Sequence, residues 1–140
     1  MLHTEDYIVE QGVSDIWTYR KWASGIAECW GKFERENVST TEFKEWGNMY
    51  SVEIKQLPSK PTLDDRRFLY PFEFIGKPYE IVNVGSSELA LLPYTFSNGT
   101  PTTTASGAYK ACRPDTIANN ISSTTIELNI YTIGKWKQGE

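Results

Sequence analysis

Carboxylates are the side chains of this 140-residue chain that could support catalysis, and the reaction they would serve is glycoside hydrolysis. That reaction needs two carboxyl groups, one as the acid and one as the nucleophile or base. The candidates are Glu28, Glu42, Glu53, Asp64, Asp65, Glu73, Glu88 and Asp115. Their spacing singles out no pair, and Arg20 with Glu28 is better explained as an ion pair across two strands. The sequence therefore predicts no catalytic carboxylates.

Chemistry based on histidine, metals or phosphates has fewer residues to use. His3 is the only histidine, no serine lies in a GxSxG turn, and no glycine-rich phosphate loop occurs. Cys29 and Cys112 have no metal-ligand spacing, and we expect both to be buried thiols. We therefore expect a non-enzymatic protein without a metal site or a cofactor.

A threonine-rich loop at residues 97–107 has side chains that suit sugar binding. Aromatic rings stack on the apolar face of a pyranose, while amides and hydroxyls bond its hydroxyl groups. Such groups are provided by Asn98, Thr100, Thr102, Thr103 and Thr104, with Tyr94 or Tyr109 nearby. The alternative is that this loop only connects two strands in solvent.

Composition excludes two classes of partner. The formal net charge is -4 and the pI is about 5.1, which gives no electrostatic footprint for nucleic acid. The longest aliphatic run, at residues 89–92, is far shorter than a membrane span, and residues 1–6 have no signal-peptide character. We expect no nucleic-acid partner, no membrane insertion and synthesis in a cytoplasm.

A β-hairpin over residues 16–30 is the strongest structural signal. Residues 23–25 form a three-residue loop, and its glycine, Gly25, can adopt the positive φ that such a loop needs. Counting outward from this loop places Arg20 opposite Glu28 and Trp22 opposite Ile26. The register of the hairpin follows from its turn.

Both faces of this hairpin are apolar. Because side chains alternate along a strand, Trp22 and Trp30 share one face, whereas Trp17 and Tyr19 share the other. One face can pack on the domain's own core, and the other then needs a second cover. We expect Trp17, Tyr19, Trp22 and Trp30 to contribute to the core and to a subunit interface.

Further strands are predicted wherever apolar and polar residues alternate between turn signals. They span residues 7–10, 49–54, 68–75, 79–84, 89–96, 108–112 and 124–133. The charged stretch at residues 32–48 is expected to be a long loop. The sequence thus predicts one all-β domain over residues 1–140, with residues 1–6 as a flexible tail. The expected architecture is an antiparallel β-sandwich of eight or nine strands.

Residues 7–31, with YIVEQG followed by IWTYRKWASGIAECW, closely resemble a motif near the C-terminus of tail fibre and related tail structural proteins of bacteriophages and prophages. The resemblance resumes at residues 70–74 and at IGKWK, residues 133–137. It implies a terminal head domain in the virion tail that assembles as a homotrimer and binds a host-surface glycan or another receptor. One alternative is a purely structural tail or baseplate component without receptor binding. A weaker one is a glycan-cleaving tail enzyme.

The loops of consecutive antiparallel strands alternate between the two ends of a domain. On the expected strand order, residues 32–48, 76–78 and 97–107 share one end. A fibre preceding the chain would leave that end distal, where long loops carry binding residues. The predicted receptor-binding residues are Trp46, Asn98, Thr100, Thr102 and Thr103.

Overall fold

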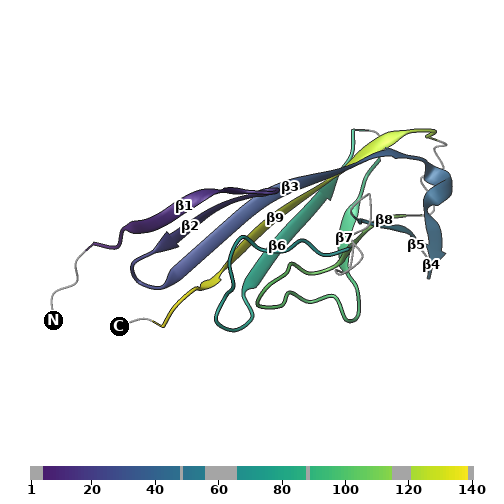
Figure 1. The fold of residues 1–140 in the computed structure, drawn as a ribbon. Coiled ribbons are helices and arrows are strands. Elements are labelled where there is room, and N and C mark those ends of the chain that lie inside the picture. The colour runs from purple at the N-terminus through teal and green to yellow at the C-terminus, as the bar shows by residue number, and fades with distance from the viewer. Residues whose placement is uncertain (1–4, 48, 56–65, 88, 115–120, 139–140) are drawn as a thin grey trace.

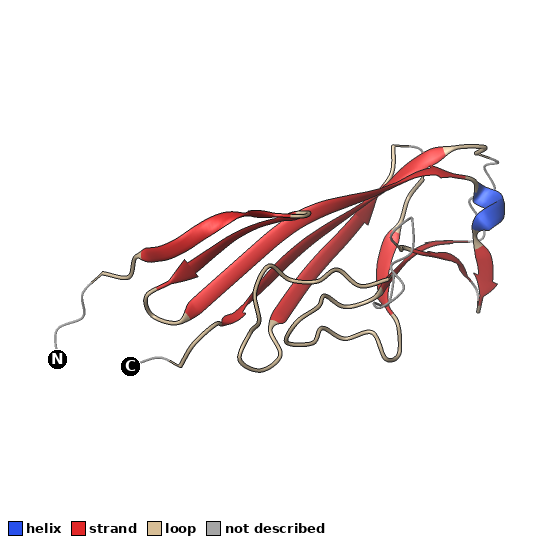
Figure 2. Ribbon diagram, viewed as in Figure 1, coloured by secondary structure: helices blue, strands red, loops and turns tan. Residues whose placement is uncertain are grey.

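The computed structural model describes residues 5–47, 49–55, 66–87, 89–114 and 121–138. Among them it contains nine β-strands, one short 3-10 helix and no α-helix. The strands form two antiparallel sheets, so the expected all-β antiparallel fold class is confirmed (Figure 2). Within these residues, no helix has the length and apolarity needed to cross a membrane.

The larger sheet has five strands in the order β1-β2-β3-β9-β6 (Figure 1). They are β1 (Ile8–Ser14), β2 (Trp17–Trp22), β3 (Ile26–Val38), β9 (Thr124–Lys135) and β6 (Tyr79–Gly85). The described chain begins and ends beside the turn at residues 23–25. There Ala23 N donates to Tyr7 O at 2.8 Å, and Trp136 N donates to Gly25 O at 2.9 Å.

The smaller sheet has four strands in the order β4-β5-β8-β7 and lies toward the other end of the long strands (Figure 1). They are β4 (Lys44–Trp46), β5 (Met49–Glu53), β8 (Tyr109–Pro114) and β7 (Leu92–Thr95). The 3-10 helix η1 (Thr40–Glu42) connects β3 to β4, and a capping box between Ser39 and Glu42 fixes its start. The connection between the two sheets is therefore short and ordered.

The predicted hairpin is confirmed in its turn and in its register. Gly25 has φ 100°, and its N–H donates to Trp22 O at 3.0 Å. Arg20 lies opposite Glu28, with Nε 3.1 Å from the Glu28 Oε1. Local turn geometry was sufficient to place these side chains.

The prediction of one long loop at residues 32–48 is wrong. β3 continues to Val38 and pairs with β9, so that Lys32 lies opposite Asn129 and Phe33 opposite Leu128. The charged residues alternate with inward ones, and the Phe33 ring packs 4.8 Å from the Phe68 ring. A partner strand of 12 residues makes this extension possible, because it satisfies the backbone groups of β3.

The prediction of a strand at residues 68–75 is also wrong. Only an isolated bridge between Leu69 and Ala105 forms there. Pro71 has no N–H to donate to a ladder, and the segment packs its aromatic rings under the large sheet instead. Its N–H groups bond the threonine-rich loop: Tyr70 N donates to Thr104 O and Phe74 N to Thr103 O, both at 2.9 Å. Two irregular segments therefore support each other.

The core lies between the inner face of the large sheet, the small sheet and these two irregular segments. Its fully buried large side chains include Trp17, Ile54, Phe68, Phe74, Ile126 and Leu128. Cys29 and Cys112 are buried free thiols, as expected from the sequence. Burial raises the pKa of both thiols, so both stay protonated at neutral pH.

Glu80, on the inner face of β6, joins the parts of this core through one carboxylate. Its Oε2 accepts hydrogen bonds from Tyr70 OH and Thr132 Oγ1, both at 2.6 Å. Its Oε1 accepts from Tyr109 OH at 2.5 Å and from Gly107 N at 2.9 Å. These donors come from the 68–75 segment, β9, β8 and the threonine-rich loop, so the carboxylate links both sheets to both irregular segments.

Replacing the turn glycine tests the hairpin. Gly25→Val forces a β-branched residue into positive φ and should lower the free energy of unfolding by about 2–3 kcal/mol. The control is Gly85→Val, because Gly85 has no positive φ and no atom within 4 Å of an added Cβ. Denaturant unfolding measures both, and equal effects would show that the turn is not responsible.

Neutralising Glu80 tests the shared carboxylate. Glu80→Gln keeps the shape but turns an NH2 group toward two of the four donors, so we expect a loss of about 1–3 kcal/mol of unfolding free energy. Glu73→Gln on the exposed side of the 68–75 segment serves as the control, with an expected change within about 0.5 kcal/mol. A Glu80 variant as stable as the control would contradict the role assigned to the carboxylate.

Candidate functional site

The outer face of the small sheet carries an aromatic cover. Trp46 on β4 and Tyr94 on β7 project from the two edge strands and meet edge to face, with ring centroids 4.3 Å apart. Ser51 and Cys112, on the strands between them, are buried beneath this pair. Tyr94 remains half exposed, so the cover also presents an aromatic surface to solvent.

Basic side chains border this aromatic cover. Lys110 lies opposite Tyr94 in the register, and its Nζ is 4.7 Å from the ring centroids of both Trp46 and Phe96. Arg66 Cζ lies 4.6 Å from the Phe96 ring on the same surface. Trp46, Phe96 and Lys110 line a groove of about 490 Å³. We call Trp46, Phe96 and Lys110, together with the Tyr94 ring that packs against Trp46, the aromatic groove.

Asn98 and Thr100 are exposed on a loop whose backbone is fixed. The guanidinium of Arg67 donates to Asn98 O at 2.8 Å and to Thr100 O at 2.9 Å. It also donates to Ser106 O at 2.9 Å, which ties the start of the loop to its end. Phe96 precedes Asn98 by two residues, and its O accepts from Gly99 N at 2.8 Å. Phe96 is therefore both a residue of the aromatic groove and the start of the turn that carries Asn98.

Two of the predicted binding residues serve the loop itself. Thr102 Oγ1 accepts from Ala105 N at 3.0 Å and donates to Ala105 O at 3.3 Å. Thr103 O accepts from Phe74 N, which holds this part of the loop against the 68–75 segment. Trp46 thus lines the aromatic groove and Asn98 and Thr100 are exposed on the loop that follows Phe96, whereas Thr102 and Thr103 are placed by internal contacts.

The predicted division of loops between the two ends is wrong. The 76–78 turn lies with the hairpin turn: Ile75 N donates to Lys135 O at 2.8 Å, and a Cβ added at Gly134 would lie 3.1 Å from Pro78 Cβ. β4 and η1 lie at the opposite end of β3 (Figure 1). The count failed because residues 32–38 are strand and residues 68–75 are not.

The predicted interface residues divide between core and surface. Trp17 is a correction, because it is 0% exposed within one chain and its Nε1 donates to Leu69 O at 2.7 Å. Tyr19 packs on the core, with its ring 5.7 Å from the Phe72 ring. Trp22 and Trp30 are only partly buried, on the opposite face. Of the four predicted residues, only Trp22 and Trp30 are therefore on the surface that faces away from the core.

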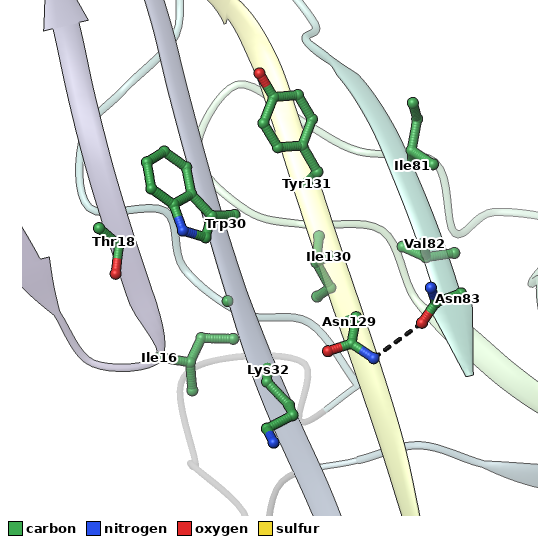
Figure 3. A pocket seen from close by; sticks show the side chains of 11 residues that line it. Ile16, Thr18, Trp30, Lys32, Ile81, Val82, Asn83, Asn129, Ile130 and Tyr131 are labelled. Carbon is green, nitrogen blue, oxygen red and sulfur yellow. Dashed lines mark hydrogen bonds between the residues drawn. The ribbon is translucent and has the colours of Figure 1, made fainter. Parts of the chain in front are cut away.

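We call that surface the outer face of the large sheet. Directly opposed residues form one row across all five strands: Val13, Thr18, Trp30, Tyr131 and Ile81. The Trp30 and Tyr131 rings lie side by side, 6.5 Å apart and inclined by 22° (Figure 3). Beside them Asn129 Nδ2 donates to Asn83 Oδ1 at 2.9 Å. Aromatic and amide groups are thus exposed together on a flat sheet.

Ionic contacts fix the rings of this row. Arg20 Cζ lies 4.8 Å from the Trp30 ring centroid and 5.9 Å from that of Trp22. One carboxylate oxygen of Glu28 forms an ion pair with Arg20, and the other accepts a hydrogen bond from the Tyr131 hydroxyl. Burial, followed by the hydrogen bond and the charge of Glu28, raises the pKa of Tyr131 to about 12. A group of aromatic, Arg and Glu side chains is therefore preorganised on the outer face.

The candidate carboxylates in the described part of the chain do not form an evident catalytic pair. Glu28 is engaged by Arg20 and Tyr131, and Glu42 lies 2.7 Å from Arg35. The candidates Asp64, Asp65, Glu88 and Asp115 lie outside the described residues. Within that part of the chain, no three His, Cys, Asp or Glu side chains gather as a metal site would require.

Comparison of the chain with family models, with curated proteins and with solved structures gives no match. The chemistry of the site therefore has to be inferred from its own geometry. Phe96, Lys110 and Arg66 were missed from the sequence. Tyr94 and Phe96 are two residues apart, and this spacing could have placed them on one side of the strand. No local pattern indicates that Lys110 lies close to both the Phe96 ring and the Trp46 ring.

The tyrosines predict loss of stability at alkaline pH. The pKa values of Tyr70, Tyr109 and Tyr131 are raised by burial and by neighbouring carboxylates, so the folded state favours their neutral form. Their stabilising contribution is complete below the unfolded pKa of about 10 and is lost as pH rises toward the folded values. Denaturant unfolding between pH 8 and 12, as an approximate range around that pKa, should show this fall. Tyr131→Phe should reduce the slope, and a slope that is unchanged would contradict the assignment.

Proposed function

We propose that this chain is the non-enzymatic head domain of a phage or prophage tail fibre-like protein, located in the virion tail. In this proposal the head is a homotrimer that binds a glycan on the host surface. The resemblance at residues 7–31 and 133–137 supports the family. Its dense part falls on β1, β2 and β3, and its last part reaches the end of β9, which pairs with β3. The resembling segments are therefore neighbours in one sheet.

The observation that carries glycan binding is the aromatic groove, together with Asn98 and Thr100, which are exposed on the loop that begins directly after Phe96. A half-exposed ring such as Tyr94 can stack on a sugar, and the exposed amide and hydroxyl can bond its hydroxyl groups. Arg67 holds the backbone of both polar residues before any ligand arrives. A fixed loop loses less conformational entropy on binding, which favours affinity.

A purely structural tail or baseplate component is the second candidate. It is favoured by the packing of the threonine-rich loop, in which Thr102 and Thr103 bond their own chain. A loop used only to cover the large sheet needs no ligand. The two candidates differ in whether the aromatic groove binds host polymers.

Asn98→Ala and Trp46→Phe test receptor binding, with an array of bacterial surface glycans as the first probe. Loss of one net hydrogen bond of about 1 kcal/mol should weaken the affinity of Asn98→Ala roughly fivefold. Trp46→Phe retains the cover over Cys112 but reduces the stacking surface, and should weaken binding by a similar factor. Calorimetric titration with a soluble fragment of the bound glycan measures both affinities.

Gln138→Ala is the matched control, because Gln138 is an exposed amide that lies beyond the end of β9. It should retain the affinity of the unmodified protein. A folded protein that binds no glycan of the array and no intact host cell wall would support the structural component instead. Equal losses in Gln138→Ala and Asn98→Ala would place the ligand elsewhere.

A further inference from the structure

The outer face of the large sheet exposes apolar side chains at both of its edges. Val13 on β1 is 76% exposed, and Ile81 and Tyr79 on β6 are 71% and 82% exposed. β1 and β6 are the two edge strands, and Val13 and Ile81 are the two ends of the row that passes through Trp30. A monomer would leave this whole row in water, at a cost that burial would remove.

Trp30 stands between two shallow hollows on this face. The hollow toward β6, about 510 Å³, is lined by Trp30, Tyr131 and Ile81 among others (Figure 3). The hollow toward β1, about 470 Å³, is lined by Trp30, Thr18, Val13 and the backbone of Gly12. The face thus offers projecting side chains on β6 and a mainly apolar recess beside β1.

The charges at the paired register positions of the outer face are balanced. Its register positions include three cations, Arg20, Lys32 and Lys135, and three carboxylates, Glu28, Glu34 and Glu127. Arg20 pairs with Glu28 at 3.1 Å, and Lys32 lies 3.4 Å from Glu34 and 3.8 Å from Glu127. The chain as a whole has a net charge of -4, so the excess negative charge lies outside these paired positions. Two copies of this face can meet without a net repulsion of like charges at these positions.

We propose that the outer face is the contact between copies of this chain, and that Ile81 and Tyr79 of one copy enter the β1-side hollow of the next. The proposal rests on the proposed function and specifies how its homotrimer is built. Because the contact joins opposite edges of one face, it is heterologous and can close into a ring of three. The Trp, Tyr and Arg side chains beside the hollow are the types that dominate binding energy at interfaces.

The first test is the molecular mass of charge variants by light scattering at micromolar concentration. The unmodified protein should be a trimer, and Ile81→Lys should raise its dissociation constant by at least roughly tenfold, because a buried charge would be unpaired. Leu92→Lys is the matched control, since Leu92 is 57% exposed on the small sheet. A monomeric unmodified protein, or equal effects of the two variants, would overturn the interface.

The second test is disulfide formation between copies. Val13 and Ile81 are four strand spacings apart within one chain, roughly 19 Å, so new cysteines there cannot bond intramolecularly. Cys29 and Cys112 are buried and contribute little background. Oxidation of the Val13→Cys, Ile81→Cys double variant should give covalent trimers, whereas each single variant should stay uncrosslinked. A covalent dimer from Ile81→Cys alone would show a two-fold contact and overturn the heterologous arrangement.

These experiments distinguish a failure of the proposed interface from a failure of the proposed glycan binding. A monomer that still binds a glycan through Asn98 would remove the proposed interface and leave the receptor function. A crosslinked trimer that binds no glycan would remove the receptor function and leave the interface.

Discussion

One carboxylate sets the relation between the regular and the irregular parts of this fold. Glu80 gathers three hydroxyls and one backbone N–H, and its charge makes each of these hydrogen bonds stronger than a neutral one. The donors lie on four different parts of the chain, and of these only β9, which carries Thr132, pairs with the β6 strand of Glu80. Without this acceptor, Tyr70 and Tyr109 would be buried hydroxyls in need of another partner, and the loops that carry Asn98 and Thr100 would lose an anchor. The candidate site on the small sheet thus depends on a residue inside the molecule.

The sequence predicted the parts of the fold that are decided locally. The hairpin was placed correctly because the Gly25 turn determines its own register, and the alternation of residues 124–133 identified β9. Residues 32–38 and 68–75 were assigned wrongly because their conformations depend on distant partners. β3 extends since β9 is available beside it, and the 68–75 segment bonds the threonine-rich loop rather than a neighbouring strand. Alternating Phe and Tyr residues indicate burial on one side, but Pro71 and the absence of a ladder decide against a strand.

The candidate site was predictable to a similar extent. Residue type alone marked Trp46, Asn98 and Thr100, yet the groove also needs Phe96 and Lys110, which β8 brings close through its pairing with β7. Thr102 has the same chemistry as Thr100 and a different task, because its hydroxyl closes a turn on Ala105. Trp17 and Trp30 belong to one hairpin, and alternation put them on opposite faces; which face is inward depends on the segments that cover it.

The position of β9 in the sheet affects how the protein can be made. β9 lies between β3 and β6, although it is the last strand of the described chain to be synthesised. β3 and β6 are joined in this sheet only through β9, so the five-stranded sheet cannot be completed before residue 135 has left the ribosome. Closure of this sheet then depends on contacts that span about a hundred residues, and such topologies fold slowly. During that interval the apolar strands are exposed next to other nascent chains of the same polysome, which makes chaperone binding an advantage for this domain.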